Sequence, residues 1–184
     1  WLLKSLANIP ADPARVDELL QSITDQSGNW PIARSLAARQ RFQVADHYYQ
    51  KRLTLLSEAN SLVTIYLGTS PGFRKVHARS DSQDSIYSVD VEALEVSAFS
   101  SDWIEPRLLQ VRTPLRIDTD LYNLYLENGV WRSATGGAPE QQELETLLTT
   151  LKTLTVDGVA NEGLQRDLSA VEADLILKIQ SFTG

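Results

Sequence analysis

Residues 51–89 read KRLTLLSEANSLVTIYLGTSPGFRKVHARSDSQDSIYSV, and this stretch decides the fold. Runs rich in β-branched, aliphatic and aromatic residues alternate in it with polar turns, which is typical of short strands. The predicted strands are Lys51–Ser57, Leu62–Leu67, Arg74–Arg79 and Ile86–Val89. Only Glu58-Ala59-Asn60-Ser61 separates the first two runs, so they are predicted to form a hairpin. Strands joined this closely predict an antiparallel β-meander.

Amphipathic helices flank this meander. Asp12 can cap free amides and Pro13 suits a first helical turn, so a helix is predicted to begin there. Its apolar stripe is Val16, Leu19, Leu20 and Ile23. A second stripe at the same spacing follows Pro139, at Leu144, Leu147, Leu148 and Leu151. Shorter helices are predicted at Ser35–Arg41, at Leu164–Leu168, and after Asp90 with Val91, Leu94 and Ala98 on one face. The sequence predicts an α+β fold with an antiparallel sheet and helices packed on one face.

A second group of strands is predicted in the remainder of the chain. Asn128-Gly129 is its strongest signal, because both residues tolerate the positive φ angles of a type I′ hairpin turn. The predicted strands are Leu115–Ile117, Tyr122–Glu127, Val130–Arg132, Val156–Ala160 and Asp174–Ile179, with a short strand or extended link earlier at Trp30–Ile32.

The two long helices match in their surroundings as well as in their stripes. Each follows a tryptophan and a proline, and each precedes a helical turn that contains Gln-Arg and then a strand. The matched features are Trp1 with Trp131, Pro13 with Pro139, and Gln40-Arg41 with Gln165-Arg166. Any two amphipathic helices share a stripe, but the shared flanking order favours an internal repeat. We therefore predict a first repeat unit at 1–112 and a second, incomplete unit at 113–184.

Composition excludes several classes of protein. The 184 residues are 42% hydrophobic and 22% charged, which is typical of a globular domain rather than a disordered chain. A net charge of −7 argues against a general nucleic-acid binder and against attraction to an anionic membrane. The absence of cysteine excludes disulfides, thiolate metal sites and cysteine nucleophiles.

The ends of the sequence predict a piece of a longer protein. It contains no methionine and begins at Trp1-Leu2-Leu3. No apolar run approaches the roughly 18 residues that a membrane span needs, and no signal peptide is visible. Any anchor or export signal is expected upstream.

Several segments together resemble a known family. Residues 62–79 read LVTIYLGTSPGFRKVHAR, residues 86–90 read IYSVD, and residues 102–111 read DWIEPRLLQV. In this order they resemble the domain of unknown function 4340 family, bacterial proteins of the cell envelope. The resemblance covers most of the chain. The order of the motifs is more specific than any single motif.

The resemblance implies a location but no chemistry. Family members are similar to proteins with one N-terminal membrane span and a periplasmic remainder. Their genes often stand beside those for ABC-type export components that resemble those of gliding motility. The expected location is therefore the periplasmic side of a bacterial inner membrane, with transporter components as expected partners. No catalytic residues are carried over.

The main candidate site is a basic strand in this acidic chain. It contains Arg74, Lys75, His77 and Arg79, and Asp81–Glu105 that follows has no Lys or Arg. Strand alternation predicts Lys75, His77 and Arg79 on one side, as a docking face for an acidic partner or an anionic glycan. The simpler interpretation is charge pairing with Asp84 or its neighbours. The preceding loop, with Gly68, Thr69, Ser70 and Gly72, could form a small anion-binding nest, or it could be an ordinary hairpin loop.

Other residues predict no chemistry. His47 and His77 could hold a metal only with carboxylates, and the His-Glu-x-x-His spacing is missing. Asp118-Thr119-Asp120 fits a capped turn better than an aspartic-protease motif. Asp81–Asp84 lacks EF-hand spacing. The four tryptophans are predicted to be core anchors. We expect no catalytic residue, metal or cofactor.

The function predicted from the sequence is a non-catalytic extracytoplasmic interaction or scaffold domain of a membrane-anchored protein associated with an ABC-type envelope transport system. One alternative is a ligand-binding domain for a glycan or another anion. A second alternative is an uncharacterised hydrolase, which would need converging carboxylates with raised pKa values.

Overall fold

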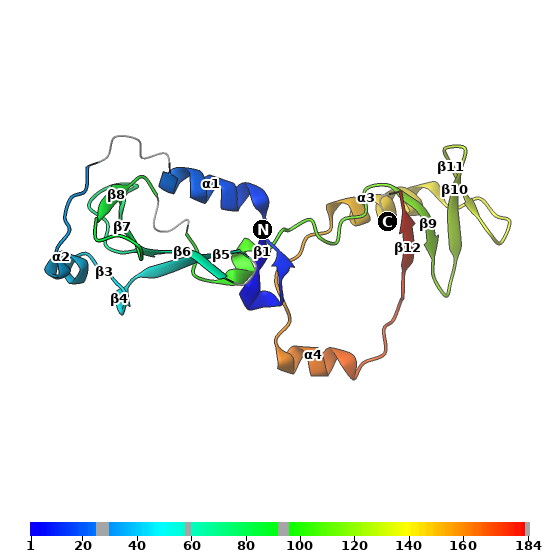
Figure 1. Ribbon diagram of the computed structural model, residues 1–184. Coiled ribbons are helices and arrows are strands. Elements are labelled where there is room, and N and C mark those ends of the chain that lie inside the picture. Colours follow the sequence, from blue (N-terminus) through cyan, green and yellow to red (C-terminus); the bar gives the residue numbers. More distant parts are fainter. Residues whose placement is uncertain (25–29, 58–59, 92–95, 183–184) are drawn as a thin grey trace. The chain divides into compact units, whose positions relative to one another are not determined.

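The computed structural model describes residues 1–24, 30–57, 60–91 and 96–182 (Figure 1). The chain forms two compact units. The first contains Trp1 and Ala11–Trp103, and the second contains Leu2–Pro10 and Ile104–Gly184. The predicted boundary between residues 112 and 113, and the internal repeat, stay predictions.

The first unit is built on the predicted meander. Strands β5 (Lys51–Ser57), β6 (Asn60–Leu67), β7 (Val76–Ser80) and β8 (Tyr87–Val89) form one antiparallel sheet in that order. The register places Leu53 opposite Ile65, Tyr66 opposite Arg79, and His77 opposite Ser88. Strand β7 begins later than predicted, because Arg74 has a φ of 53°, outside the β region.

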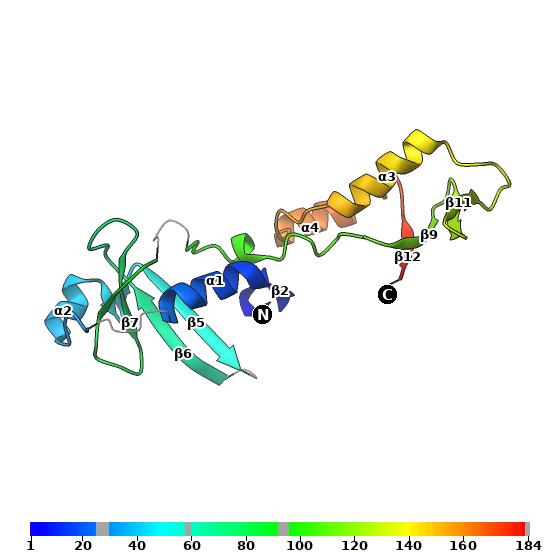
Figure 2. The ribbon, with the colours of Figure 1, turned by 90° about the horizontal axis from the view of Figure 1, so that it is seen from above.

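One face of this sheet is covered by helix α1 (Pro13–Thr24), which lies along the sheet in Figure 2. The Asp12 carboxylate accepts hydrogen bonds from the Ala14 and Arg15 amides at 3.0 and 3.4 Å, which confirms the predicted cap. The stripe residues Leu19 and Ile23 belong to the core below. The buried residues of this first core are Leu19, Leu67, Val76, Ala78, Val89, Val91 and Val96.

A second, smaller core lies on the other face of the sheet, where Tyr66 points away from its neighbour Leu67. Val44, Tyr66 and Ile86 form its buried centre. Helix α2 (Leu36–Arg41) and the hairpin of β3 (Val44–Ala45) and β4 (Tyr48–Tyr49) pack over this centre with Ala38, Phe42 and Tyr49. Ile86 is also tied to the preceding link, because it exchanges backbone hydrogen bonds with Ile32 and Ala33 at 2.8 and 2.9 Å.

The second unit repeats this plan of a helix on an antiparallel sheet. Its strands β9 (Pro114–Asp118), β10 (Asn123–Glu127), β11 (Val130–Ser133) and β12 (Lys178–Ser181) lie in the order β11-β10-β9-β12. Asn128 and Gly129 have φ angles of 50° and 79°, as the predicted turn requires. Helix α3 (Gln141–Thr153) packs Leu144, Leu147, Leu148 and Leu151 against Ile117, Leu124, Trp131 and Ile179.

The remaining elements of the second unit are small. Strands β1 (Leu2–Leu3) and β2 (Ile9–Pro10) pair with each other around a short 3-10 helix at Lys4–Leu6. Helix α4 (Glu162–Ser169) confirms the predicted helical turn and is capped by Asn161. In the first unit, a second 3-10 helix at Ser100–Trp103 lies within the predicted connector.

Two strands predicted from the sequence are wrong, one in whole and one in its start. Residues 156–160 form an irregular segment rather than a strand, and the Val156 amide donates to Pro106 O at 3.0 Å. The final strand begins at Lys178 rather than at Asp174. Of the two alternatives predicted for Trp30–Ile32, a short strand or an extended link, the structure shows the link, which leads to an isolated bridge between Ala33 and Ile86.

Part of the helix predicted after Asp90 lies outside the described residues, at 92–95. Among the helices in the described part of the chain, none has both the length and the apolar character needed to cross a bilayer. The predicted α+β class with antiparallel sheets is confirmed.

Candidate functional site

The predicted basic face does not exist as one exposed surface. Both sides of β7 are covered, with Val76 and Ala78 in the first core and with His77 and Arg79 turned to the other face. His77 is 6% exposed and Arg79 is 2% exposed. Alternation correctly predicts that these two residues share a face, but α2 and the β3–β4 hairpin cover that face.

The Arg79 guanidinium is held by four oxygen acceptors. Its Nε donates to Val44 O at 2.8 Å, and its Nη1 donates to Ser80 O and Gln83 O at 3.1 and 3.2 Å. Its Nη2 forms an ion pair with Asp46, whereas the pairing interpretation named Asp84 or its neighbours. Its ring partner is Tyr66, whose centroid lies 4.9 Å from Arg79 Cζ. Arg79 therefore ties the β3–β4 hairpin to the sheet.

Asp84 instead binds an arginine of α2. It pairs with Arg39, whose side chain is 15% exposed. Charge pairing of the basic strand is thus present, but the partner of Arg79 is Asp46 rather than Asp84 or one of its neighbours. The reason is that residues 39 and 46 reach the strand from a distant part of the sequence.

His77 is enclosed by the same hairpin region. Its ring stacks on Phe42 with centroids 4.1 Å apart, and its Nδ1 lies 2.9 Å from Thr69 Oγ1. Burial lowers the pKa of His77 below its ordinary value of 6.5, and the charge of Arg41 lowers this pKa further. A hydrogen bond with the Thr69 backbone acts in the opposite direction. A neutral, stacked imidazole of this kind contributes to packing.

The pKa of His77 predicts a pH dependence of stability. Well above the ordinary pKa of 6.5 the ring is neutral in both the folded and the unfolded chain. As the pH falls from there, the unfolded chain binds a proton before the folded chain does, so the free energy of unfolding decreases. Denaturant unfolding between about pH 7.5 and about pH 5 should show this loss.

The control for this prediction is His77→Gln, which has no titratable group at position 77. The variant should be nearly insensitive to pH in the same window. Asp81 does not interfere in this pH window. A backbone hydrogen bond from Thr64 lowers the pKa of Asp81 below its ordinary value of 3.8, so the stability change caused by its protonation falls at lower pH. Identical profiles for the two proteins would contradict the assignment to His77.

The loop before β7 begins at Gly68 and Thr69, and the backbone of these two residues packs against residues at the end of α2. The Gly68 amide donates to His77 O, and the Thr69 amide donates to Phe42 O, both at 2.9 Å. A Cβ at Gly68 would lie 2.0 Å from Phe42 O. Gly68 and Thr69 therefore join the loop to the end of α2, and their amides are not available to an anion.

The middle of the loop is closed by its own hydrogen bonds. Ser70 Oγ donates to Gly72 O and Lys75 O, both at 2.6 Å, and the Lys75 amide donates to Gly72 O at 3.3 Å. These bonds describe a hairpin loop, the simpler of the two predicted interpretations. The loop displays Phe73, which is 86% exposed.

Arg74 and Lys75 are the exposed members of the basic strand. Lys75 Nζ lies 3.1 Å from Asp90 Oδ1 at the surface, an ion pair of small energetic value. Arg74 lies with its guanidinium 5.9 Å from the Phe73 ring. The predicted site residues are thus neighbours in space, but of the four basic-strand residues only Arg74 and Lys75 are exposed, together with Ser70 and Gly72 of the loop.

The sequence matches the family described as a domain of unknown function, DUF4340, over residues 1–174. The chain belongs to the DUF4340 family. No curated protein and no solved structure matches it.

The tryptophans of this DUF4340 chain divide into two kinds. Trp103 and Trp131 pack against the cores, and Trp103 Nε1 donates to Ser97 O at 3.0 Å. Trp30 is 87% exposed and Trp1 is 54% exposed, so the prediction of core anchors is wrong for these two.

The other polar candidates of this DUF4340 chain are engaged in local contacts. Gln40 Nε2 lies 2.8 Å from His47 Nε2, and Asp118 binds Arg116 at 2.7 Å. Among the described residues, no group of three or more His, Asp or Glu side chains could hold a metal ion.

Sequence reasoning missed an exposed apolar region of the DUF4340 chain. Residues 161–178 are all exposed, although many of their side chains are large and apolar. These are Leu164, Leu168, Val171, Leu175, Ile176 and Leu177. The sequence predicts a helical turn at Leu164–Leu168 and a strand after it, but the spacing of apolar residues does not show whether another element covers them.

Proposed function

We propose that this DUF4340 chain is a non-catalytic interaction domain of a membrane-anchored, extracytoplasmic protein that works with an ABC-type envelope transport system. The observation that carries the interaction role is the exposed apolar stretch at 161–178. Soluble domains rarely leave a contiguous apolar surface open unless it binds something. Leu168 and Val171, at 61% and 71% exposed, lie in the middle of this stretch.

The two buried polar residues of the basic strand also support a non-catalytic role, because their contacts lie within the fold. Arg79 and His77 are engaged with Val44, Asp46, Phe42 and Thr69, within the fold of the first unit. Such residues stabilise a scaffold. The periplasmic location and the transporter partners rest on the family resemblance, which is an argument from similarity.

Site-specific photocrosslinking in the native membrane tests the proposal. A photoreactive residue at Leu168 of the full-length parent protein should crosslink to transporter subunits. The matched control is Leu121, which is 80% exposed in the turn between β9 and β10 and lies outside the apolar stretch. We expect several times more crosslinked product from position 168 than from position 121.

Two further variants complete the experiment. Leu164→Glu with Leu168→Glu should abolish the crosslink from a reporter at Val171, because carboxylates are costly in an apolar contact. Arg74→Glu with Lys75→Glu should leave that crosslink in place. If positions 168 and 171 yield no protein crosslink in the native membrane, the interaction role fails.

A further inference from the structure

The loop before β7 ends in a tight turn at the surface of the first unit. Gly72 and Lys75 form an isolated antiparallel bridge, and the Lys75 amide donates to Gly72 O at 3.3 Å. Phe73 and Arg74 lie between them, and all four residues are exposed. The internal hydrogen bonds of the loop hold the base of this turn in place. We call residues 73–75 the β7 tip.

The backbone of the β7 tip is strained at Arg74, whose φ of 53° lies in the left-handed region. Glycine adopts this region at no steric cost, whereas a residue with a Cβ does not. Residues held in such conformations concentrate at binding and functional sites. The turn therefore carries an arginine where glycine would give the less strained backbone, which favours a role for the guanidinium outside the fold.

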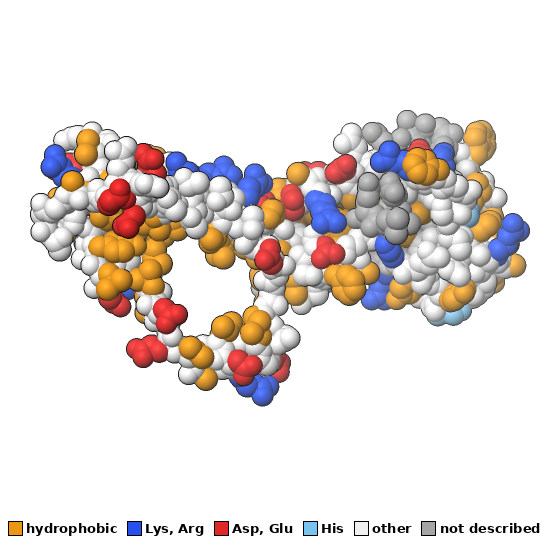
Figure 3. All heavy atoms as spheres, turned by 180° about the vertical axis from the view of Figure 1, so that it is seen from behind, with side chains coloured by type: hydrophobic (Ala, Val, Ile, Leu, Met, Phe, Trp, Pro, Cys, Tyr) orange, Lys and Arg blue, Asp and Glu red, His pale blue; other side chains and the backbone are white. Residues whose placement is uncertain are grey.

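An exposed aromatic ring lies beside this charge. Phe73 is 86% exposed, and the Arg74 guanidinium lies 5.9 Å from its ring. Lys75 adds a second cation, and its side chain is still 49% exposed although Nζ lies 3.1 Å from Asp90 Oδ1. Figure 3 shows several Lys and Arg side chains of the first unit beside apolar side chains. The β7 tip thus joins one large apolar group and two cations in three consecutive residues.

A third cation lies near the start of the same loop. Arg41, the last residue of α2, is exposed, and its guanidinium lies 5.1 Å from the Phe42 ring. The Phe42 carbonyl accepts the Thr69 amide at 2.9 Å, so the end of α2 is joined to the loop. The charge of Arg41 also acts on His77 in β7. Arg41 therefore adds to the positive charge around the loop that carries the β7 tip.

These features fit a lipid bilayer better than a small anion or a protein partner. The amides of Gly68 and Thr69 are used within the fold, so the loop does not form an anion nest. A stable protein interface buries about 800 Å² on each partner, far more than a three-residue tip supplies. A bilayer contact needs less area, because an aromatic ring can enter the headgroup region while the cations beside it attract anionic lipids.

The acidic character of the whole chain restricts such a contact to a local one. A net charge of −7 repels an anionic surface on average. Salt screens exposed charges beyond about 10 Å at 0.1 M ionic strength, so the cations at the tip dominate where the tip meets the surface.

We propose that the β7 tip is a membrane-contact loop for an anionic phospholipid bilayer. Phe73 inserts among the lipid headgroups, and Arg74, Lys75 and Arg41 bind lipid phosphates. The contact is weak by itself and becomes effective when the chain is held close to a membrane. It rests on the proposed membrane anchoring for this proximity alone, and it is independent of the protein partner proposed for residues 161–178.

A fluorescent reporter beside the tip tests the proposal. The chain contains no cysteine, so Gly72→Cys accepts a single polarity-sensitive nitrobenzoxadiazole label, and a Cβ at Gly72 meets no atom within 4 Å. The full chain is tethered through an N-terminal polyhistidine tag and a long flexible linker to vesicles with nickel-chelating lipid, which supplies the proximity without the natural anchor. On phosphatidylglycerol-containing vesicles, the emission should shift to shorter wavelengths and rise severalfold. On phosphatidylcholine vesicles, and from a label at Leu121→Cys in the second unit, it should change little.

Two sets of substitutions separate the parts of the contact. Arg74→Gln with Lys75→Gln should lower the insertion equilibrium by about thirtyfold, because two cations are lost near an anionic surface. Phe73→Ser should lower it by about tenfold or more. Arg74→Gly should also weaken insertion, although it relieves the backbone strain and does not destabilise the first unit.

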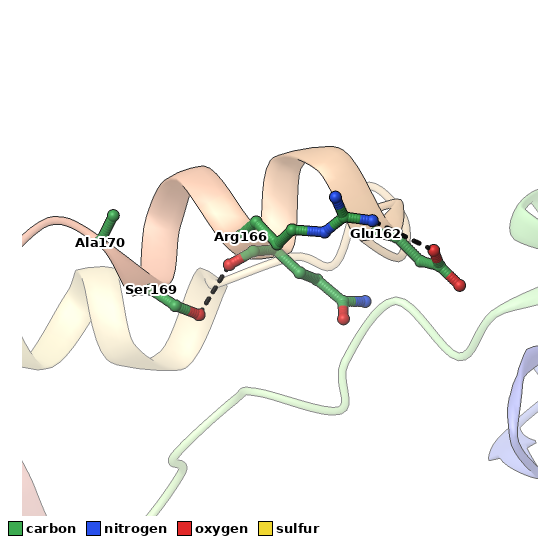
Figure 4. Close-up of a pocket in the computed structure, with 5 residues that line it drawn as sticks. Glu162, Arg166, Ser169 and Ala170 are labelled. Carbon is green, nitrogen blue, oxygen red and sulfur yellow. Dashed lines mark hydrogen bonds and ion pairs between the residues drawn. The ribbon is translucent and has the colours of Figure 1, made fainter.

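The matched control removes the same charge from the second unit. Arg132 and Arg166 are exposed, and Arg166 Nη2 lies 3.5 Å from Glu162 Oε2 on α4 (Figure 4). Arg132→Gln with Arg166→Gln should leave insertion unchanged.

Three results would overturn the membrane contact. These are an unchanged emission on phosphatidylglycerol vesicles, an emission change that survives Arg74→Gln with Lys75→Gln, and an equal change with soluble polyglutamate in place of vesicles. The last result would indicate an acidic protein as the partner of the tip. Because the tether replaces the natural anchor, failure of the crosslinks at positions 168 and 171 would not affect this outcome.

Discussion

Gly68→Ala should destabilise the first unit by about 3 kcal/mol or more and lower its melting temperature by about 12 °C or more. The added methyl group would lie 2.0 Å from Phe42 O, 2.6 Å from Gln43 O and 2.8 Å from Val44 Cγ1. Two of these atoms belong to the backbone, so no rotamer change can relieve the overlap. The segment after α2 would have to move away from the sheet and open the smaller core.

Gly72→Ala is the matched control for this prediction. Gly72 lies in the same loop, and a Cβ there meets no atom within 4 Å. We expect its free energy of unfolding to stay within about 0.5 kcal/mol of the unmodified chain. Thermal unfolding followed by circular dichroism measures both variants. Equal melting temperatures for Gly68→Ala and Gly72→Ala would show that the close packing around Gly68 does not limit the size of the residue at this position.

Arg79→Leu should cost about 3 to 5 kcal/mol, because it removes a buried guanidinium that donates to three backbone carbonyl oxygens and leaves them without that donor. The leucine keeps an apolar stem but leaves Val44 O without its 2.8 Å donor. Val44 itself is fully buried, so water cannot easily replace that donor. The hairpin of β3 and β4 would lose its main polar connection to β7.

Two milder variants give the expected order of effects. Arg79→Lys retains a charge but offers no planar fork of donors, so its loss should be intermediate. Asp46→Asn should cost about 1 kcal/mol or less, because the Asp46 side chain is 65% exposed and an amide oxygen can still accept. Chemical denaturation ranks the three. If Arg79→Leu is as stable as Asp46→Asn, Arg79 does not hold the hairpin.

Local chemistry explains what could be predicted from the sequence. Asp12 caps α1, and Asn128-Gly129 turns β10 into β11, because each depends on residues only a few positions away. The meander of β5 to β8 is predictable for the same reason, since each strand pairs with the next one along the chain. The α+β class follows from these local features.

Burial of the basic strand could not be predicted in this way. Alternation shows that His77 and Arg79 share a face, but it does not show that residues 42–46 cover that face. Those contacts join residues more than thirty positions apart, such as Arg79 to Asp46. The same limit applies to helix α4, where helical spacing identifies an apolar side with Leu164 and Leu168 without identifying its partner. The sequence therefore predicts a docking face on two residues, His77 and Arg79, that the fold uses internally.

The position of Ile86 has a consequence for the synthesis of the protein. Ile86 closes the smaller core and holds residues 32 and 33 by backbone hydrogen bonds, although it lies about forty residues after Val44. A ribosome adds residues from the N-terminus at a finite rate. Until Ile86 has left the exit tunnel, the nascent chain must carry Phe42 and Val44 uncovered. A chaperone that binds emerging apolar segments would therefore find its earliest target in residues 30–49 and lose it when β8 is complete.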